Sequence, residues 1–223
     1  MTEATSFLYP FIEADEVDAG ELLRDLTASA RSKQLASEAL RQSTLARSAD
    51  EIERTADAMA DRFGRGGRLF VFGNGGSSTD AASLAALFLQ PPWGRPLPAR
   101  NLVDDSAVLT ALGNDVGFDL VFSRQLIAHA HADDMAIGLS TSGNSRNLLY
   151  AFEEASARQL LTIGIAGYSG GEMAASPHVV HCLVVDADSV HRIQETQAGL
   201  GFALWQSVQA RLSKMEDGND SLG

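Results

Sequence analysis

The spacing of hydrophobic residues changes along this 223-residue chain. Residues 18 to about 47 carry leucines and alanines at helical intervals among polar residues, which predicts an amphipathic helix. The segment SADE at 48–51 matches a helix capping box, so a second helix is predicted from there to about Phe63. The glycines of GRGG at 64–67 are expected to end it.

Short apolar runs then alternate with helical patterns. Runs of this kind are typical of strands that are buried on both faces, and we expect them at 68–72, 99–103, 135–140, 160–167 and 178–186. Helices are predicted between them, with a long final helix over 192–214. This order predicts an α/β fold, a doubly wound five-stranded parallel sheet flanked by helices. We expect an N-terminal helical extension (1–47), one main domain (48–214) and a disordered tail (215–223).

Composition and charge restrict the partners. The chain has 29 acidic and 17 basic residues, a net charge of −12, and 45% hydrophobic residues, enough for a buried core. Such a charge repels phosphate backbones at long range, so no direct nucleic-acid partner is expected. A small anion is still compatible with this charge, because backbone N–H groups act over a few ångströms.

The expected location is the cytoplasm. Cys182 is the single cysteine and lies in an apolar run, so we expect no disulfide and a reducing compartment. No apolar run approaches the ~20 residues that a membrane span needs, and the acidic N-terminus lacks the basic start of a signal peptide. No membrane partner is expected.

Two glycine- and serine-rich segments follow predicted strands. These are GNGGSS at 73–78 and STSGNS at 140–145, and each precedes a helical pattern. Ligands of open α/β sheets bind beyond the carboxyl ends of strands, and hydroxyl groups at a helix N-terminus suit a phosphate. Each segment alone is also compatible with an ordinary turn with a serine cap, as in the S-x-x-D pattern of Ser77 and Asp80. Neither segment is a Walker A loop or a dinucleotide fingerprint.

Four stretches carry a resemblance to a known family: FVFGNGGSSTDAA, ALGNDVGFDLVFSRQL, GLSTSGNSRNLLYAFEEA and RIQETQ. In this order they resemble the sugar isomerase (SIS) domain, from roughly residue 48 to residue 212. Within that family they are most similar to the phosphoheptose (sedoheptulose 7-phosphate) isomerase group, which includes the replication-initiator-associating proteins of bacteria. The resemblance implies a five-stranded parallel sheet, a homodimer or homotetramer with composite sites at subunit interfaces, and a phosphorylated sugar as ligand.

The resemblance also implies a set of binding residues, and all the residue types are present. The phosphate-binding loop of the family falls on Ser140, Thr141, Ser142 and Ser145. Its sugar contacts fall on Asn74, Gly75, Gly76, Ser77, Asn114, Asp115 and Gln194.

The catalytic positions of the family differ in this chain. The isomerases carry a histidine and a glutamate on the helix after GNGGS, which ligate a metal or act as base, and a second histidine after RIQE. Those positions are Ser83, Leu87 and Phe202 here. Zinc is expected in the family, but Gln194 alone cannot hold it, so we expect no cofactor. Aldose–ketose isomerisation needs a general base, for which His191 and Glu195 are the remaining candidates.

Two functions are therefore compatible with the sequence. The first is a phosphosugar-binding protein that is non-catalytic or regulatory and meets a protein partner through an acidic surface. The alternative is an active sedoheptulose 7-phosphate isomerase with a rearranged acid or base. Apolar stripes on the leading and final helices predict homo-oligomerisation; on the final helix the stripe consists of Leu200, Phe202, Leu204, Trp205, Val208 and Leu212.

Overall fold

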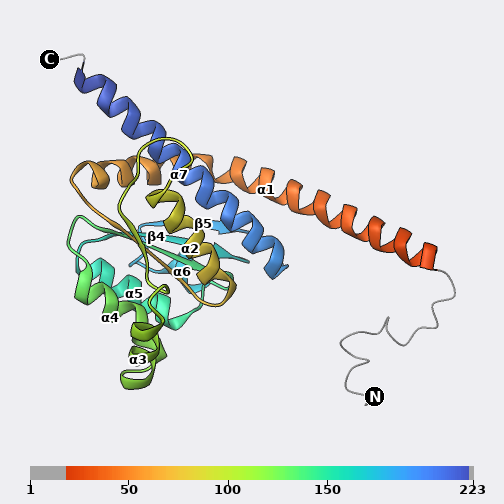
Figure 1. The fold of residues 1–223 in the computed structure, drawn as a ribbon, viewed down its shortest axis with the longest axis horizontal. Helices are drawn as coiled ribbons and strands as arrows, with labels where there is room; N and C mark the ends of the chain where they lie inside the picture. The colour runs from red at the N-terminus through yellow and green to blue at the C-terminus, as the bar shows by residue number, and fades with distance from the viewer. Residues whose placement is uncertain (1–18, 221–223) are drawn as a thin grey trace. The chain divides into compact units, whose positions relative to one another are not determined.

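The computed structural model describes residues 19–220 and shows a five-stranded parallel sheet in the order β2-β1-β3-β4-β5 (Figure 1). The strands are β1 (Leu69–Gly73), β2 (Ala99–Asn101), β3 (Met135–Ser140), β4 (Leu161–Gly167) and β5 (His181–Val185). The helices are α1 (Ala19–Gly64), α2 (Gly76–Leu89), α3 (Ser106–Asp115), the 3-10 turn η2 (Phe118–Leu120), α4 (Val121–His129), α5 (Arg146–Ala157), α6 (Gly171–Ala175) and α7 (Val190–Asp220). The predicted fold class is confirmed.

Both faces of the sheet are buried, as the continuous apolar runs predicted. In β1, Leu69 and Val71 pack into one core, and Phe70 and Phe72 pack into the other. Helices α2 and α7 and the part of α1 from about Ile52 cover the first face, while α4 and α5 cover the second (Figure 1). Alternation of this kind is what a parallel strand between two helical layers requires.

The strand order reverses beside β1. The chain leaves β1 through α2 to reach β2 on one side, then returns to β3 on the other side of β1. The register pairs Phe72 with Gly138 and Gly73 with Leu139, so the last residues of β1 and β3 are neighbours. This is the switch point at which open α/β sheets bind ligands. The segments after both strands therefore start at the same edge of the sheet.

The predicted helix break at 48–51 is wrong. Helix α1 continues through this segment, and Glu51 places Oε1 2.7 Å from Nδ1 of His181 instead of capping a helix. No glycine or proline occurs between residues 21 and 63, and a serine inside a helix is tolerated, so the backbone ladder continues. The described chain divides into two compact units between Ala39 and Leu40 rather than at the predicted boundary of 47/48.

The C-terminal predictions also need correction. Helix α7 reaches Asp220, so residues 215–220 of the tail that was expected to be disordered are helical, and residues 221–223 lie outside the described residues. The apolar residues of α7 were assigned to a subunit interface. Five of them are buried in the core of the chain itself: Leu200, Leu204, Trp205, Val208 and Leu212. Phe202 is the member of that set that remains 44% exposed.

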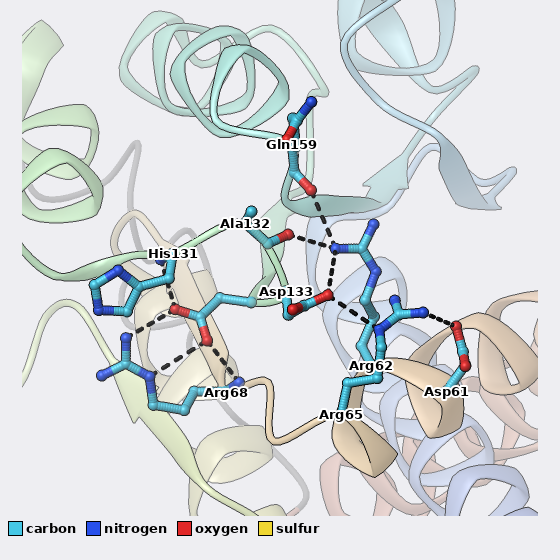
Figure 2. A network of polar contacts seen from close by, with 9 residues as sticks. Asp61, Arg62, Arg65, Arg68, His131, Ala132, Asp133 and Gln159 are labelled. Atoms are coloured by element: carbon cyan, nitrogen blue, oxygen red, sulfur yellow. Dashed lines mark hydrogen bonds and ion pairs between the residues drawn. The ribbon is translucent and has the colours of Figure 1, made fainter.

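A polar network ties α1 to the amino ends of β1 and β3, away from the switch point (Figure 2). The nearly buried Asp134 accepts hydrogen bonds from the backbone N–H of Arg68 at 2.7 Å, from its Nη2 at 2.8 Å, and from the N–H of His131 at 2.8 Å. Beside it, Asp133 accepts from Nε of Arg65 at 3.0 Å, and Arg62 donates to the carbonyl oxygen of Gln159. These bonds hold the strand starts in register.

None of the helices in the described part of the chain is both long enough and apolar enough to cross a membrane.

Candidate functional site

Three serine hydroxyl groups converge after β3. Ser140 Oγ lies 3.4 Å from Ser142 Oγ and 3.2 Å from Ser145 Oγ, and it accepts a hydrogen bond from the N–H of Gly143 at 3.0 Å. Ser145 occupies the N-cap position of α5, and its side chain makes no capping hydrogen bond. Hydroxyl groups and the free N–H groups of a helix N-terminus together favour an anion. We call residues 140–145 the serine loop.

Glycine at position 143 is required by the shape of this loop. Gly143 has φ of +68°, and a Cβ built on it would lie 2.0 Å from the carbonyl oxygen of Gly170. The loop is held from the same side by α6, because Met173 donates its N–H to the Gly143 carbonyl at 2.9 Å. Asn144 Oδ1 accepts from the N–H of Glu172 at 2.8 Å. The serine loop is therefore fixed by backbone packing before any ligand binds.

The segment after β1 contacts both α5, the helix that follows the serine loop, and α7. Asn74 and Asn147 exchange two amide hydrogen bonds, at 2.8 and 2.9 Å, and so join this segment to α5. A Cβ at Gly76 would lie 2.3 Å from Nε2 of Gln194, so the Gln194 amide packs directly on the start of α2. Asn74 therefore contacts α5 and Gly76 contacts Gln194, and the assignment of these residues to a sugar site stays a prediction.

The predicted S-x-x-D cap is wrong. Gly75, which has φ of +54°, is the N-cap residue of α2, and no side chain caps the helix. Ser77 is buried within the first turn. The carboxylate of Asp80 is therefore not used for capping.

A cavity of about 200 Å³ opens between α2, β3 and α7. Leu139, which comes directly before the serine loop, lines it, and so does Gln197, whose Nε2 donates to the Ser140 carbonyl at 3.2 Å. The remaining lining residues are Asp80, Ser83, Leu84, Leu87, Ala198, Gly201 and Phe202. The candidate site thus consists of the serine loop and an adjoining, mostly apolar cavity.

Comparison with known proteins identifies the family. A model described as the SIS domain matches residues 35–167. The chain is 42% identical to the phosphoheptose isomerase of Solidesulfovibrio magneticus over 165 residues, 72% of this chain and 78% of the relative. It is 38% identical to the phosphoheptose isomerase of Akkermansia muciniphila over 170 residues, 75% of this chain and 89% of the relative. The chain belongs to the SIS domain family.

Solved structures agree with this assignment. The phosphoheptose isomerase of Francisella tularensis matches the SIS chain with a TM-score of 0.77 and 30% identity, covering 82% of this chain and 98% of that one. The enzyme of Neisseria gonorrhoeae matches with a TM-score of 0.75 and 32% identity, covering 83% and 99%. The resemblance to phosphoheptose isomerases that the sequence motifs indicated is confirmed.

Asn114 and Asp115 lie elsewhere in this SIS chain. Both are exposed in the last turn of α3, which packs mainly against η2 and α4. Nδ2 of Asn114 donates to Oδ1 of Asp115 at 2.8 Å. Within the described part of a single chain, this pair takes no part in the hydrogen bonds that surround the serine loop. Their assignment to a sugar site stays a prediction.

The side chains at the family's metal positions do not provide ligands for the zinc ion that the resemblance implies. Ser83, Leu87 and Phe202 all line the cavity, but the side chains of two of them contain only carbon. The hydroxyl group of Ser83 already donates to the carbonyl oxygen of Thr79 at 3.0 Å. In the described residues, no group of three or more histidine, cysteine, aspartate or glutamate side chains is arranged to hold a metal.

The two candidate bases lie outside the cavity. His191 and Glu195 are four residues apart near the start of α7, and both are exposed. The cavity is lined instead by residues of α7 further along the chain, from Gln197 to Phe202. Exposed side chains on that first stretch of helix are not positioned to act on a ligand within the cavity of the same chain.

Sequence reasoning missed two cavity residues with unused polar atoms. Oδ2 of Asp80 and Oε1 of Gln197 are buried and have no hydrogen-bond partner in the described structure. Burial raises the pKa of Asp80 above its usual range. The helical spacing of Asp80, Ser83 and Leu87 carried the signal, because residues at i, i+3 and i+7 share one helix face.

Proposed function

We propose that this SIS protein binds a phosphorylated sugar and interconverts the aldose and ketose forms of a heptose phosphate such as sedoheptulose 7-phosphate. The observation that carries the proposal is the convergence of the Ser140, Ser142 and Ser145 hydroxyl groups at the N-terminus of α5, beside the cavity. Relatives at 42% and 38% identity are named phosphoheptose isomerases. These findings favour the isomerase alternative over the non-catalytic interpretation.

The two parts of the site suit the two ends of such a substrate. The phosphate of sedoheptulose 7-phosphate is at the end opposite the reacting carbons, so the serine loop anchors one end while the cavity receives the other. Binding energy from the remote phosphate then holds C1 and C2 in place. An apolar cavity excludes water and so strengthens the electrostatic interactions within it.

A specific observation supports a second candidate, a phosphosugar-binding protein without turnover. The three positions at which the family carries its histidines and glutamate are Ser83, Leu87 and Phe202, and none of them can accept a proton or bind a metal strongly. Such a protein would bind the same ligand at the serine loop and report its presence to a protein partner.

We propose further that the protein is a homodimer or homotetramer in the cytoplasm. Phe202 is 44% exposed and Trp93 47% exposed, and both rings pack at a tilt against the buried Trp205, with centroids 5.3 and 4.6 Å away. Two exposed aromatic rings beside the same buried tryptophan form an apolar surface, which favours burial against a second copy of the chain. The lone, half-buried Cys182 is compatible with a reducing compartment.

The proposed activity is tested by incubating the protein with sedoheptulose 7-phosphate in heavy water, with and without added zinc, and following the sugar by NMR. We expect an aldose heptose phosphate to form, with deuterium at the carbon next to its carbonyl. The variant Ser142→Asp should show no product, because its carboxylate repels the phosphate. Saturable binding by the wild-type protein without deuterium uptake would support the second candidate instead.

A further inference from the structure

Gln197, in the wall of the cavity, holds a fixed hydrogen-bond acceptor that has no partner in the described structure. Its side chain is fully buried, and its Nε2 donates to the carbonyl oxygens of Ser140 at 3.2 Å and Ile165 at 3.0 Å. Reversing the amide would place Oε1 against these two acceptors, so the orientation is determined by the backbone. Oε1 is left buried without a partner in the described structure. A buried acceptor of this kind destabilises the protein unless a donor reaches it.

Asp80 contributes a second buried acceptor, from α2 rather than from α7. It lies on α2, one turn before Ser83, and its Oδ2 is buried without a hydrogen-bond partner in the described structure. Of the nine residues that line the cavity, Asp80 alone has a titratable side chain. Burial without a compensating cation is costly for a carboxylate, and it raises the pKa of Asp80.

These two acceptors favour a ligand that carries hydroxyl groups. Its other walls are carbon, apart from Ser83, whose hydroxyl group is already bonded to the Thr79 carbonyl. A ligand that supplies only acceptors leaves both Gln197 Oε1 and the Asp80 carboxylate unpaired, whereas a polyol satisfies both. The cavity, of about 200 Å³, has room for the first few carbons of a sugar.

From this geometry we propose that Asp80 is the catalytic base of the isomerisation and that Gln197 Oε1 orients the substrate by accepting a hydrogen bond from a neighbouring hydroxyl group. This assignment rests on the proposed isomerase function. It places the base within the cavity, on the face of α2 that the sequence motifs mark, rather than at the exposed His191 or Glu195.

The proton transfers balance without a co-reactant. On the ketose, Asp80 removes a proton from C1, the C–H electrons form the C1=C2 bond, and the carbonyl electrons move onto O2. O2 then takes the proton of the O1 hydroxyl group, and the O1 electrons form the new C1 carbonyl. The electrons of the C1=C2 bond take the proton back from Asp80 at C2, which regenerates the carboxylate.

The test compares the full-length wild-type chain with the variant Asp80→Asn. Asp133→Asn serves as a control with the same change of charge, because Asp133 lies at the amino ends of the strands, away from the cavity. Heptose phosphate turnover is followed by NMR and binding by calorimetry. Asp80→Asn should lower kcat by about 100-fold or more, the usual contribution of a general base. Its Kd should stay within about threefold, a change of under 1 kcal/mol, because the phosphate contacts are intact. Asp133→Asn should keep the wild-type kcat and Kd.

Gln197→Met provides a second readout, with Gln209→Met as its control on the same helix. Gln209 also uses its amide in two partly buried hydrogen bonds with Arg95: Oε1 accepts from the backbone N–H, and Nε2 donates to the carbonyl oxygen. Gln209 does not line the cavity. Both variants should melt at lower temperature. Gln197→Met alone should raise KM, by about tenfold for one lost hydrogen bond to substrate.

The outcomes separate the two proposals. A wild-type protein that turns over substrate while Asp80→Asn retains its kcat overturns the assignment of the base and leaves the isomerase function standing. Equal KM values for Gln197→Met and Gln209→Met overturn the role of Gln197. A wild-type protein that binds the sugar phosphate without any turnover overturns the isomerase function, and the base assignment with it.

Discussion

Asp80 illustrates how a single residue can link function to a cost in stability. Because burial raises its pKa from the usual 3.8, the folded chain binds this proton more tightly than the unfolded chain does. The free energy of unfolding therefore falls as pH rises through the interval between the two pKa values. Within the described residues, Oδ2 of this partly buried side chain has no hydrogen-bond partner.

Replacing this carboxylate should stabilise the protein. Asp80→Asn is expected to melt at a higher temperature than wild type at pH 7, and the difference should vanish near pH 3, where Asp80 is neutral in both the folded and the unfolded chain. Thermal unfolding of the two proteins across this range measures the effect. An Asp80→Asn variant that is less stable than wild type at pH 7 would show that the carboxylate has a stabilising partner.

Individual residues also show what the sequence could and could not predict. Ser140, Ser142 and Ser145 were predicted as a cluster because a short loop at a strand end brings them together locally. Gln197 was not, since its orientation depends on carbonyl oxygens 57 and 32 residues away in sequence. No local pattern encodes such contacts. Asp80 was assigned to a cap because the S-x-x-D spacing also fits a helix start.

At the level of elements, hydrophobic periodicity located the strands and most helices. Continuous apolar runs predicted the buried strands, including β3 and β4, because a strand between two helical layers needs apolar residues on both faces. The helix break at 48–51 was predicted from a capping pattern. The backbone hydrogen bonds of α1 continue through this segment, so no break forms. Helix α6, of five residues, is too short to show a helical period.

The aromatic pair on α7 and the loop after α2 yields a prediction about assembly. The variant Trp93→Ser should shift the protein from dimer or tetramer toward monomer in sedimentation at micromolar concentration, because it removes apolar area from the proposed interface. Val180→Ser, which changes another exposed apolar residue (63% exposed), should leave the sedimentation unchanged. A wild-type protein that sediments as a monomer contradicts this interface.

At the scale of the whole molecule, topology explains why the segment after β1 and the serine loop lie at the same end of the sheet. The strand order places β1 beside β3, so GNGG and the serine loop meet although about 65 residues separate them. The family comparisons confirm this architecture for the chain. The acidic balance of the sequence is compatible with the proposed anion binding, because hydroxyl and backbone N–H groups act over a few ångströms.

The central claim is that the serine loop binds the phosphate of a sugar. Isothermal titration of sedoheptulose 7-phosphate into wild type, Ser142→Asp and the control Ser213→Asp, an exposed position on α7, tests it most directly. We expect saturable binding by wild type and by Ser213→Asp, and a loss of about 100-fold or more in affinity for Ser142→Asp, roughly 2.7 kcal/mol. Equal affinity in all three proteins, or no binding by wild type, would contradict the claim.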